Sequence, residues 1–292
     1  MDTMNCDILE ASKRVKPLSP SLINLLQVTA KRDHALSDVH SIIQLDPVLT
    51  AAILRAANSA AFRKSEIVDS LSTAVSLLGE RFVVGVALDL CSDGFFEQPL
   101  VGYESEAGDL WRHSIKTAIA ARLVSRYARR PTDSNLAFTA GILHDIGKVV
   151  LSSFLEGSAR QLAMSVGPEA DSLSYLDAEK KKLGSNHCEA GLALSKLWRL
   201  PECYQAAIAF HHEPEKAPEN LIPFVFAVHM GDTLAMMSGA STGADGLLYP
   251  LHPGYVNHFN LTSETTQLIV LHMEEEYTAM CLSLENRKGA GE

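Results

Sequence analysis

Apolar residues recur at helical spacing along almost the whole chain, and this pattern constrains the fold more than any other feature. Leu22 and Leu26 share one face of a segment that begins at Ser19-Pro20, a capping residue followed by the proline favoured at the first helical position. The same start signal, Asp46-Pro47, opens another apolar segment. No segment alternates convincingly at period two with β-branched residues. The sequence therefore predicts an all-α protein without a sheet.

Breaks in the periodicity divide the 292 residues into three parts. Five short helical segments precede residue 90, one of which Gly79 would close in the left-handed conformation. Glycines and prolines interrupt the pattern between Ser92 and Asp109. We expect an N-terminal five-helix bundle over 15–92, a second helical core over 109–237, and a loop with a C-terminal helix over 238–292. Within the core, residues 135–155 read as one helical run.

Charge and composition exclude several classes of protein. The formal charge of −10, from 25 basic and 35 acidic residues, argues against a general nucleic-acid-binding protein. The N-terminus lacks the basic and apolar regions of a secretory signal, and no uncharged apolar run approaches the length of a membrane span. Five widely spaced cysteines without a Cys-x-x-Cys pair are typical of reduced thiols. We expect a cytoplasmic protein that does not bind a membrane.

The adjacent pair His144-Asp145 is the feature that points to chemistry, because it lies within an apolar run. Such a pair is costly to bury unless it is hydrogen-bonded or ligates a metal ion. Further imidazoles and a carboxylate stand at helical positions elsewhere: His113, His187, His211, His212 and Asp232. This donor set suits a divalent transition metal such as Fe, Mn, Zn or Ni, and one or two ions could be held. Asp145 and a nearby cation, Lys148, are the candidate catalytic residues of such a centre, which typically acts on phosphate esters.

These residues resemble the HD metal-dependent phosphohydrolase superfamily, in which a His, a His-Asp pair and a closing Asp follow in order. His187 and His211-His212 are similar to the additional ligands of the HD-GYP cyclic-dinucleotide phosphodiesterases. The segment after His212 lacks the Gly-Tyr-Pro element of that subfamily, which argues against cyclic-di-GMP hydrolysis.

A more extensive resemblance covers roughly residues 15 to 235 and identifies the chain as similar to the HDOD domain, an HD-related output domain of bacterial signalling proteins. The matching stretches are Leu18-Ser19-Pro20, Gln44-Leu45-Asp46-Pro47, Asn58-Ser59-Ala60-Ala61-Phe62, Ala74-Val75-Ser76-Leu77-Leu78-Gly79, Trp111-Arg112-His113-Ser114, Leu143-His144-Asp145-Ile146-Gly147-Lys148 and Trp198-Arg199-Leu200-Pro201. The resemblance implies a helical bundle packed on an HD-type helical core and a role in signal transduction, without a defined reaction. By ligand type and order, one ion would lie among His113, His144, Asp145 and Asp232. A second would lie between Asp145 and the set His187, His211 and His212.

Each candidate residue also has a purely structural interpretation. His144-Asp145, and likewise His113 with Asp232, could be hydrogen-bonded pairs between helices. His187 stands at a helix start, where it could be a surface residue, and His211-His212 could stabilise a helix C-terminus as cations. Lys148 could be an ordinary solvated lysine.

Three classes of function therefore remain open. The protein could be a regulatory module that responds to a signalling protein or a nucleotide-like ligand. It could be a metal-dependent phosphohydrolase acting on a nucleotide or cyclic dinucleotide. It could also be a helical scaffold with a vestigial pocket.

Overall fold

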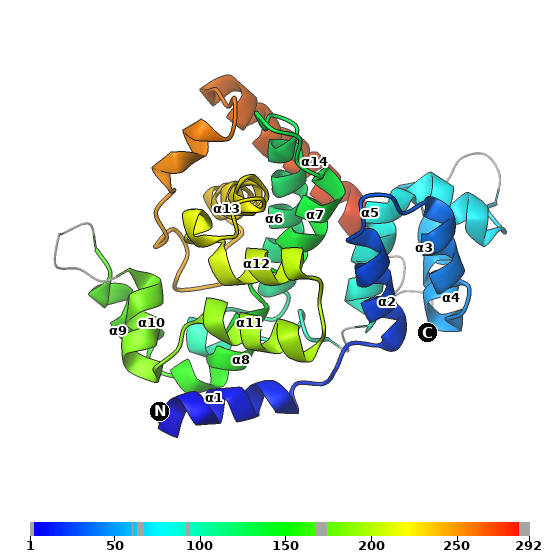
Figure 1. The fold of residues 1–292 in the computed structure, drawn as a ribbon. Helices are drawn as coiled ribbons and strands as arrows, with labels where there is room; N and C mark the ends of the chain where they lie inside the picture. Colours follow the sequence, from blue (N-terminus) through cyan, green and yellow to red (C-terminus); the bar gives the residue numbers. More distant parts are fainter. Residues whose placement is uncertain (1–2, 60, 63–66, 92–93, 168–173, 286–292) are drawn as a thin grey trace.

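Helices dominate the computed structural model, which describes residues 3–59, 61–62, 67–91, 94–167 and 174–285 (Figure 1). Within these ranges β-type pairing is limited to isolated bridges, such as Leu100 with Ser105 and Ala128 with Phe259. The predicted all-α class is confirmed.

The N-terminal bundle consists of four helices that pack against one another at one side of the molecule (Figure 1). They are α2 (Pro20–Thr29), α3 (Leu36–Ile43), α4 (Pro47–Ala57) and α5 (Leu71–Cys91). Both predicted caps are present: the Ser19 hydroxyl accepts from the Leu22 amide at 3.2 Å, and the Asp46 carboxylate accepts from the Val48 amide at 3.0 Å. The last two of the five predicted segments form the single helix α5, which is kinked at Gly79 with φ 74°.

The first helix, α1 (Thr3–Arg14), is not predicted by the periodicity, and it does not join the bundle. It packs against α8 (Ile146–Leu155) and α11 (His187–Leu197) of the second core, and Figure 1 shows it running beneath these two helices. The chain therefore starts on the second core, crosses to the bundle and returns.

The second core is built on α6 (Asp109–Ser125), which lies against α7 (Ser134–Leu143) and α13 (Ile222–Met237). Two glycines permit this close approach. A Cβ on Gly141 of α7 would lie 2.5 Å from the Ala118 Cα, and one on Gly231 of α13 would lie 2.6 Å from the Thr117 carbonyl oxygen. Backbones this close bring side chains from all three helices within reach of one another. The remaining core elements are α9 (Ala159–Ser165), α10 (Tyr175–Leu183), α12 (Glu202–Phe210), and the 3-10 turns η1 (Val101–Tyr103) and η2 (Pro214–Lys216).

After α13 the chain forms a loop with the 3-10 turn η3 (Pro253–Asn257) and ends in α14 (Ser263–Glu285). This last helix packs on α6 and extends toward α5 of the bundle (Figure 1). Two ion pairs join α14 to α6: Lys116 lies 2.6 Å from Glu274, and the buried Arg122 binds Glu276.

Two helical stretches of the described chain, Leu71–Leu90 and Ser134–Leu155, are long and apolar enough to cross a membrane by length and composition. In the folded protein, 56% and 83% of the most apolar 18 residues of these two stretches are buried. Burial against other helices accounts for their composition, as is usual for core helices.

Candidate metal centre

All seven predicted ligand residues meet at one point of the second core, although they come from separate elements. His113 lies on α6, Asp232 on α13 and His187 at the start of α11. His211 and His212 directly follow α12, where the chain turns toward η2. His144 and Asp145 lie between α7 and α8.

The expectation of one continuous helix through His144-Asp145 is wrong. The helix is interrupted there: α7 ends at Leu143, and Asp145 has φ −101° and ψ 14°. On a continuous helix adjacent side chains diverge by about 100°, so only one of the two could face the centre squarely. The break lets the adjacent imidazole and carboxylate face the same point.

The first group of ligands is His113, His144 and Asp232, with one oxygen of Asp145. The Nε2 atoms of His113 and His144 are 3.2 Å apart. His113 Nε2 also lies 3.2 Å from Asp232 Oδ1 and 3.6 Å from Asp145 Oδ2. All four side chains are at most 4% exposed.

The second group surrounds the other oxygen of Asp145. His187 Nε2 and His211 Nε2 lie 3.6 and 3.5 Å from Asp145 Oδ1. His212, whose side chain is 6% exposed, completes a set of four donors that lie within 4.8 Å of one another. Asp145 therefore stands between the two groups, with one oxygen toward each.

The outward nitrogen of four histidines is bonded to the protein, which fixes the direction of each ring. His113 Nδ1 lies 2.8 Å from the Ala240 carbonyl oxygen, and His144 Nδ1 lies 2.8 Å from that of Gly141. His211 Nδ1 lies 3.1 Å from the Ile208 carbonyl oxygen, and His187 Nδ1 lies 2.8 Å from Glu179. Because these oxygens can only accept, Nδ1 donates and Nε2 presents its lone pair to the centre.

The inward atoms lack the partners that buried polar atoms normally have. Asp145 Oδ1, His187 Nε2, His211 Nε2 and both ring nitrogens of His212 form no hydrogen bond. The lone pairs of His113 and His144 also face each other at 3.2 Å, which is unfavourable without a positive charge beside them. Buried nitrogen and carboxylate donors left in this state fit a metal ion, which would satisfy all of them at once.

The charges of the centre shift the pKa values of its groups strongly. Burial opposes ionisation of Asp145, but the Lys148 ammonium and the His144 imidazole outweigh it and hold the pKa of Asp145 well below its usual value. Burial lowers the pKa of His144, and the Asp145 and Asp232 carboxylates more than compensate, so that it is raised. Burial, with repulsion from His211, holds the pKa of His212 well below the usual value. Most of the centre therefore favours added positive charge, whether it comes from protons or from a metal ion.

Lys148 is a buried part of the centre, with 3% of its surface exposed, so the interpretation as a solvated lysine is wrong. Its ammonium lies 2.7 Å from both Asp145 Oδ2 and Asp245 Oδ2, and it donates to the Thr242 hydroxyl at 2.7 Å. The Tyr249 hydroxyl donates in turn to Asp245 at 3.1 Å. All three hydrogen-bonding or ionic partners of Lys148 are thus protein groups.

The other structural interpretations can be judged from the same geometry. His187 is fully buried and is not a surface residue. His211 does bond the last carbonyls of α12 through Nδ1, as the helix-end interpretation requires, but its Nε2 also faces Asp145. The two roles use different ring atoms and are compatible.

A layer of hydrogen-bonded side chains that the sequence does not predict supports the ligands and Lys148: Glu179, Tyr103, Thr242, Asp245 and Tyr249. Tyr103 and the last three lie outside the predicted range 109–237, in segments that read as loops. Glu179 alone among them carries a signal in the sequence, because it is a charged residue inside a helix that is otherwise marked by apolar spacing. Its carboxylate bonds both the backbone and the ring of His187.

Fold and site together define an all-α protein with a buried His/Asp centre of the HD type. The HDOD domain family model matches residues 16–214, and the chain belongs to this family. This confirms the resemblance carried by the sequence motifs.

A curated relative, an uncharacterized protein of Treponema pallidum (strain Nichols), is 24% identical over 270 residues, which are 91% of this chain and 51% of the relative. The chain therefore spans about half the length of that protein.

Three solved structures share the fold. An HDOD domain protein of unknown function from Geobacter sulfurreducens has a TM-score of 0.67 and 22% identity, with 96% of this chain and 98% of that one covered. A protein from Marinobacter aquaeolei VT8 described as a candidate for signal transduction has a TM-score of 0.70 and 21% identity, with 96% and 65% covered. A candidate metal-dependent phosphohydrolase from Shewanella amazonensis SB2B has a TM-score of 0.56 and 16% identity, with 97% and 99% covered.

Proposed function

We propose that the chain is a regulatory module of bacterial signal transduction, acting in the cytoplasm, whose buried centre binds one or two divalent transition-metal ions. The observation that carries this proposal is the set of inward nitrogen and carboxylate atoms that have no hydrogen-bond partner in the interior. His113, His144 and Asp232 would hold one ion, and His187, His211 and His212 the other, with Asp145 shared. A bound ion compensates the buried carboxylates, and in hydrolases of this type it also activates water.

The position of Lys148 favours regulation over hydrolysis. A lysine that assists phosphate chemistry has to offer its ammonium to the substrate. Here the ammonium is already bonded to Asp145, Asp245 and Thr242. Releasing it would leave the Asp245 carboxylate buried without its counter-charge, which is energetically costly.

The approach to the centre also disfavours an anionic substrate. A cavity of about 540 Å³ lies outside the stacked rings of His212 and Tyr249. Its two lysines are paired with two of its glutamates, Lys180 with Glu189 and Lys216 with Glu213, both at 2.5 Å. The lining carboxylates outnumber these lysines four to two: Asp177, Glu189, Glu213 and Glu215. Phosphate esters would be repelled here, whereas metal cations would be attracted.

A metal-dependent phosphohydrolase acting on a nucleotide or cyclic dinucleotide is the second candidate. The bridging position of Asp145, with one oxygen toward each ligand group, favours it. Two ions sharing a carboxylate form the arrangement that stabilises both attacking and leaving oxygens in phosphoryl transfer.

Metal analysis of protein purified without chelator tests the centre directly. We expect at least one equivalent of Fe, Mn, Zn or Ni in the wild type, with strong loss in His144→Ala and Asp145→Ala. His272→Ala, at an exposed position on α14, is the matched control and should keep the wild-type content. Absence of bound transition metal, or equal content in all four proteins, would contradict a metal centre and leave the helical scaffold.

Turnover distinguishes the two candidate functions once metal is bound. The metal-loaded protein is assayed against phosphodiesters and nucleotides with added Mn²⁺, Fe²⁺ or Ni²⁺. We expect no turnover from the regulatory module, which would respond to a signalling protein or a nucleotide-like ligand. Metal-dependent turnover that Asp145→Ala abolishes would overturn this assignment in favour of the phosphohydrolase.

A further inference from the structure

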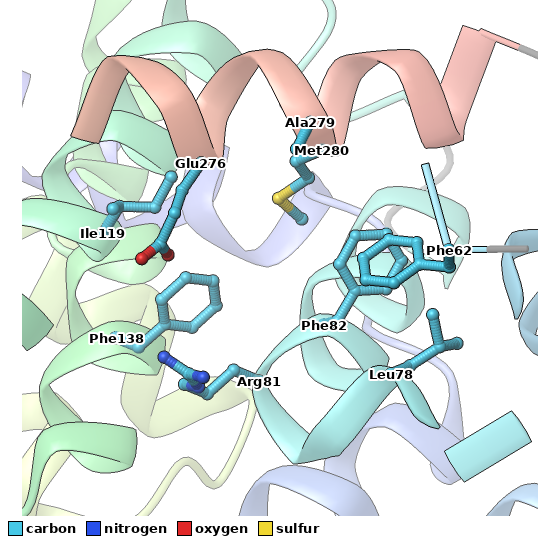
Figure 2. Close-up of a pocket in the computed structure, with 9 residues that line it drawn as sticks. All are labelled: Phe62, Leu78, Arg81, Phe82, Ile119, Phe138, Glu276, Ala279 and Met280. Carbon is cyan, nitrogen blue, oxygen red and sulfur yellow. The ribbon is translucent and has the colours of Figure 1, made fainter. Parts of the chain in front are cut away.

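A second cavity, of about 260 Å³, lies where the N-terminal bundle, the second core and α14 meet (Figure 2). Phe62 and Phe82 form its wall on the bundle side, and their rings meet edge to face at 4.6 Å. Ile119 of α6 and Phe138 of α7 line the side of the core, and Met280 lies on α14. None of the cavity residues belongs to the His/Asp centre or its supporting layer.

One end of this apolar cavity carries an excess of positive charge. The Arg81 side chain projects into it from α5, opposite Glu276 on α14 (Figure 2). Both oxygens of Glu276 are bound by Arg122, which is 1% exposed and depends on that carboxylate. Burial and the nearby Arg81 both lower the pKa of Arg122. No hydrogen bond or ion pair of the Arg81 guanidinium occurs among the described residues. Arg122 alone therefore binds the carboxylate of Glu276, and the positive charge of Arg81 has no bonded counter-charge among the described residues at this end of the cavity.

Size and lining together indicate the chemistry of an occupant. An apolar cavity of about 150 Å³ can hold a benzene molecule, so about 260 Å³ has room for a bicyclic ring system. Aromatic walls favour a flat apolar body through edge and face contacts. A guanidinium pairs best with a planar oxyanion such as a carboxylate. We propose that this junction cavity binds a small organic anion, with an apolar body of bicyclic size and its anionic group directed at Arg81.

The place of the cavity gives such a ligand a regulatory consequence. An occupant would contact α5 of the bundle, α6 and α7 of the core, and α14 at the same time. Helix α6 also carries His113, six residues before Ile119 and about 9 Å away along the helix axis. A ligand here would stabilise one arrangement of the three parts and would act on the helix that supplies a metal ligand.

Titration calorimetry with 1-naphthoate and its uncharged analogue 1-naphthalenemethanol tests the proposal on the full chain. We expect saturable one-site binding of 1-naphthoate. Arg81→Gln should weaken it at least tenfold while changing the binding of the alcohol little. Ala279→Phe places a ring at the exposed rim of the cavity and should block both compounds without disturbing packed residues. Arg160→Gln, an exposed arginine on α9, is the charge-matched control.

The proposal is overturned if folded wild-type protein does not bind 1-naphthoate saturably. It is equally overturned if Arg81→Gln and Ala279→Phe, folded by circular dichroism, bind it as the wild type does. Metal content is measured on the same samples, so failure of the cavity and failure of the metal centre are read separately.

Discussion

Lys148 sets the electrostatic balance of the centre at the level of single residues. The centre and its supporting layer hold four buried carboxylates, Asp145, Glu179, Asp232 and Asp245, and one ammonium, which pairs with Asp145 and Asp245. With neutral histidines the centre then carries three net negative charges, which a divalent cation would largely compensate. Burial lowers the pKa of Lys148, but the Asp145 and Asp245 carboxylates outweigh this effect and raise it. The ammonium therefore remains charged.

Asp245→Asn is expected to weaken metal binding, although Asp245 is not a predicted ligand. The amide preserves the shape of the side chain and removes one negative charge, so Lys148 repels an incoming cation more strongly. We expect the Kd for metal, measured by competition with a chelator, to rise about tenfold or more. Tyr249→Phe removes only the hydroxyl that donates to Asp245 and should change the Kd far less. An unchanged Kd in Asp245→Asn would show that this carboxylate does not tune the centre.

At the scale of elements, backbone contact between helices decides where the ligands lie. Helix α8 approaches α11 so closely that a Cβ on Gly147 would lie 1.8 Å from the carbonyl oxygen of His187 and 2.6 Å from the Gly191 amide nitrogen. Asn186 caps α11 by accepting from the Glu189 amide at 2.9 Å. Gly147 follows Asp145 by two residues. Its close contact with α11, together with the Asn186 cap, therefore positions His187 beside Asp145.

Gly147→Ala should therefore separate α8 from α11. We expect a loss of about 3 kcal/mol or more in the free energy of unfolding, because both clashing atoms belong to a backbone that cannot rotate away. Urea denaturation measures the loss, and metal content should fall with it. Ser153→Ala, at an exposed position of the same helix, is the control and should change the stability by less than about 0.5 kcal/mol. Wild-type stability in Gly147→Ala would contradict this packing.

For the whole molecule, α14 is the element that joins the parts. It is bound to α6 through Lys116–Glu274 and Arg122–Glu276, and its Met280 reaches α5, where a Cβ on Gly85 would lie 2.5 Å from the Met280 methyl carbon. Arg122 is almost fully buried, so its positive charge needs the Glu276 carboxylate of α14 as a counter-charge.

Glu276→Ala should loosen this connection. It leaves the Arg122 guanidinium buried without its carboxylate, and we expect a loss of about 2 kcal/mol in the free energy of unfolding, since Glu276 itself is 46% exposed. The loop between α13 and α14 should also be cleaved faster by protease. Glu275→Ala, one residue away and exposed, is the matched control. Equal stability and cleavage in the two variants would rule out a role for the Arg122 pair in docking α14.

The all-α class, most helix starts and the types of residue at the centre can be predicted from the sequence, because apolar spacing, caps and adjacent chemical groups are local in the chain. The sequence did not predict the break at His144-Asp145, since apolar residues continue on both sides, nor the supporting layer of Asp245 and Tyr249, which lies in an irregular segment. The folded structure is needed to see which atoms converge, that Lys148 is held between two carboxylates, and that a charged cavity lies at the junction with α14. The physical reason is that these properties depend on distances between residues far apart in the chain, which backbone contacts such as those at Gly141 and Gly231 fix and local periodicity does not encode.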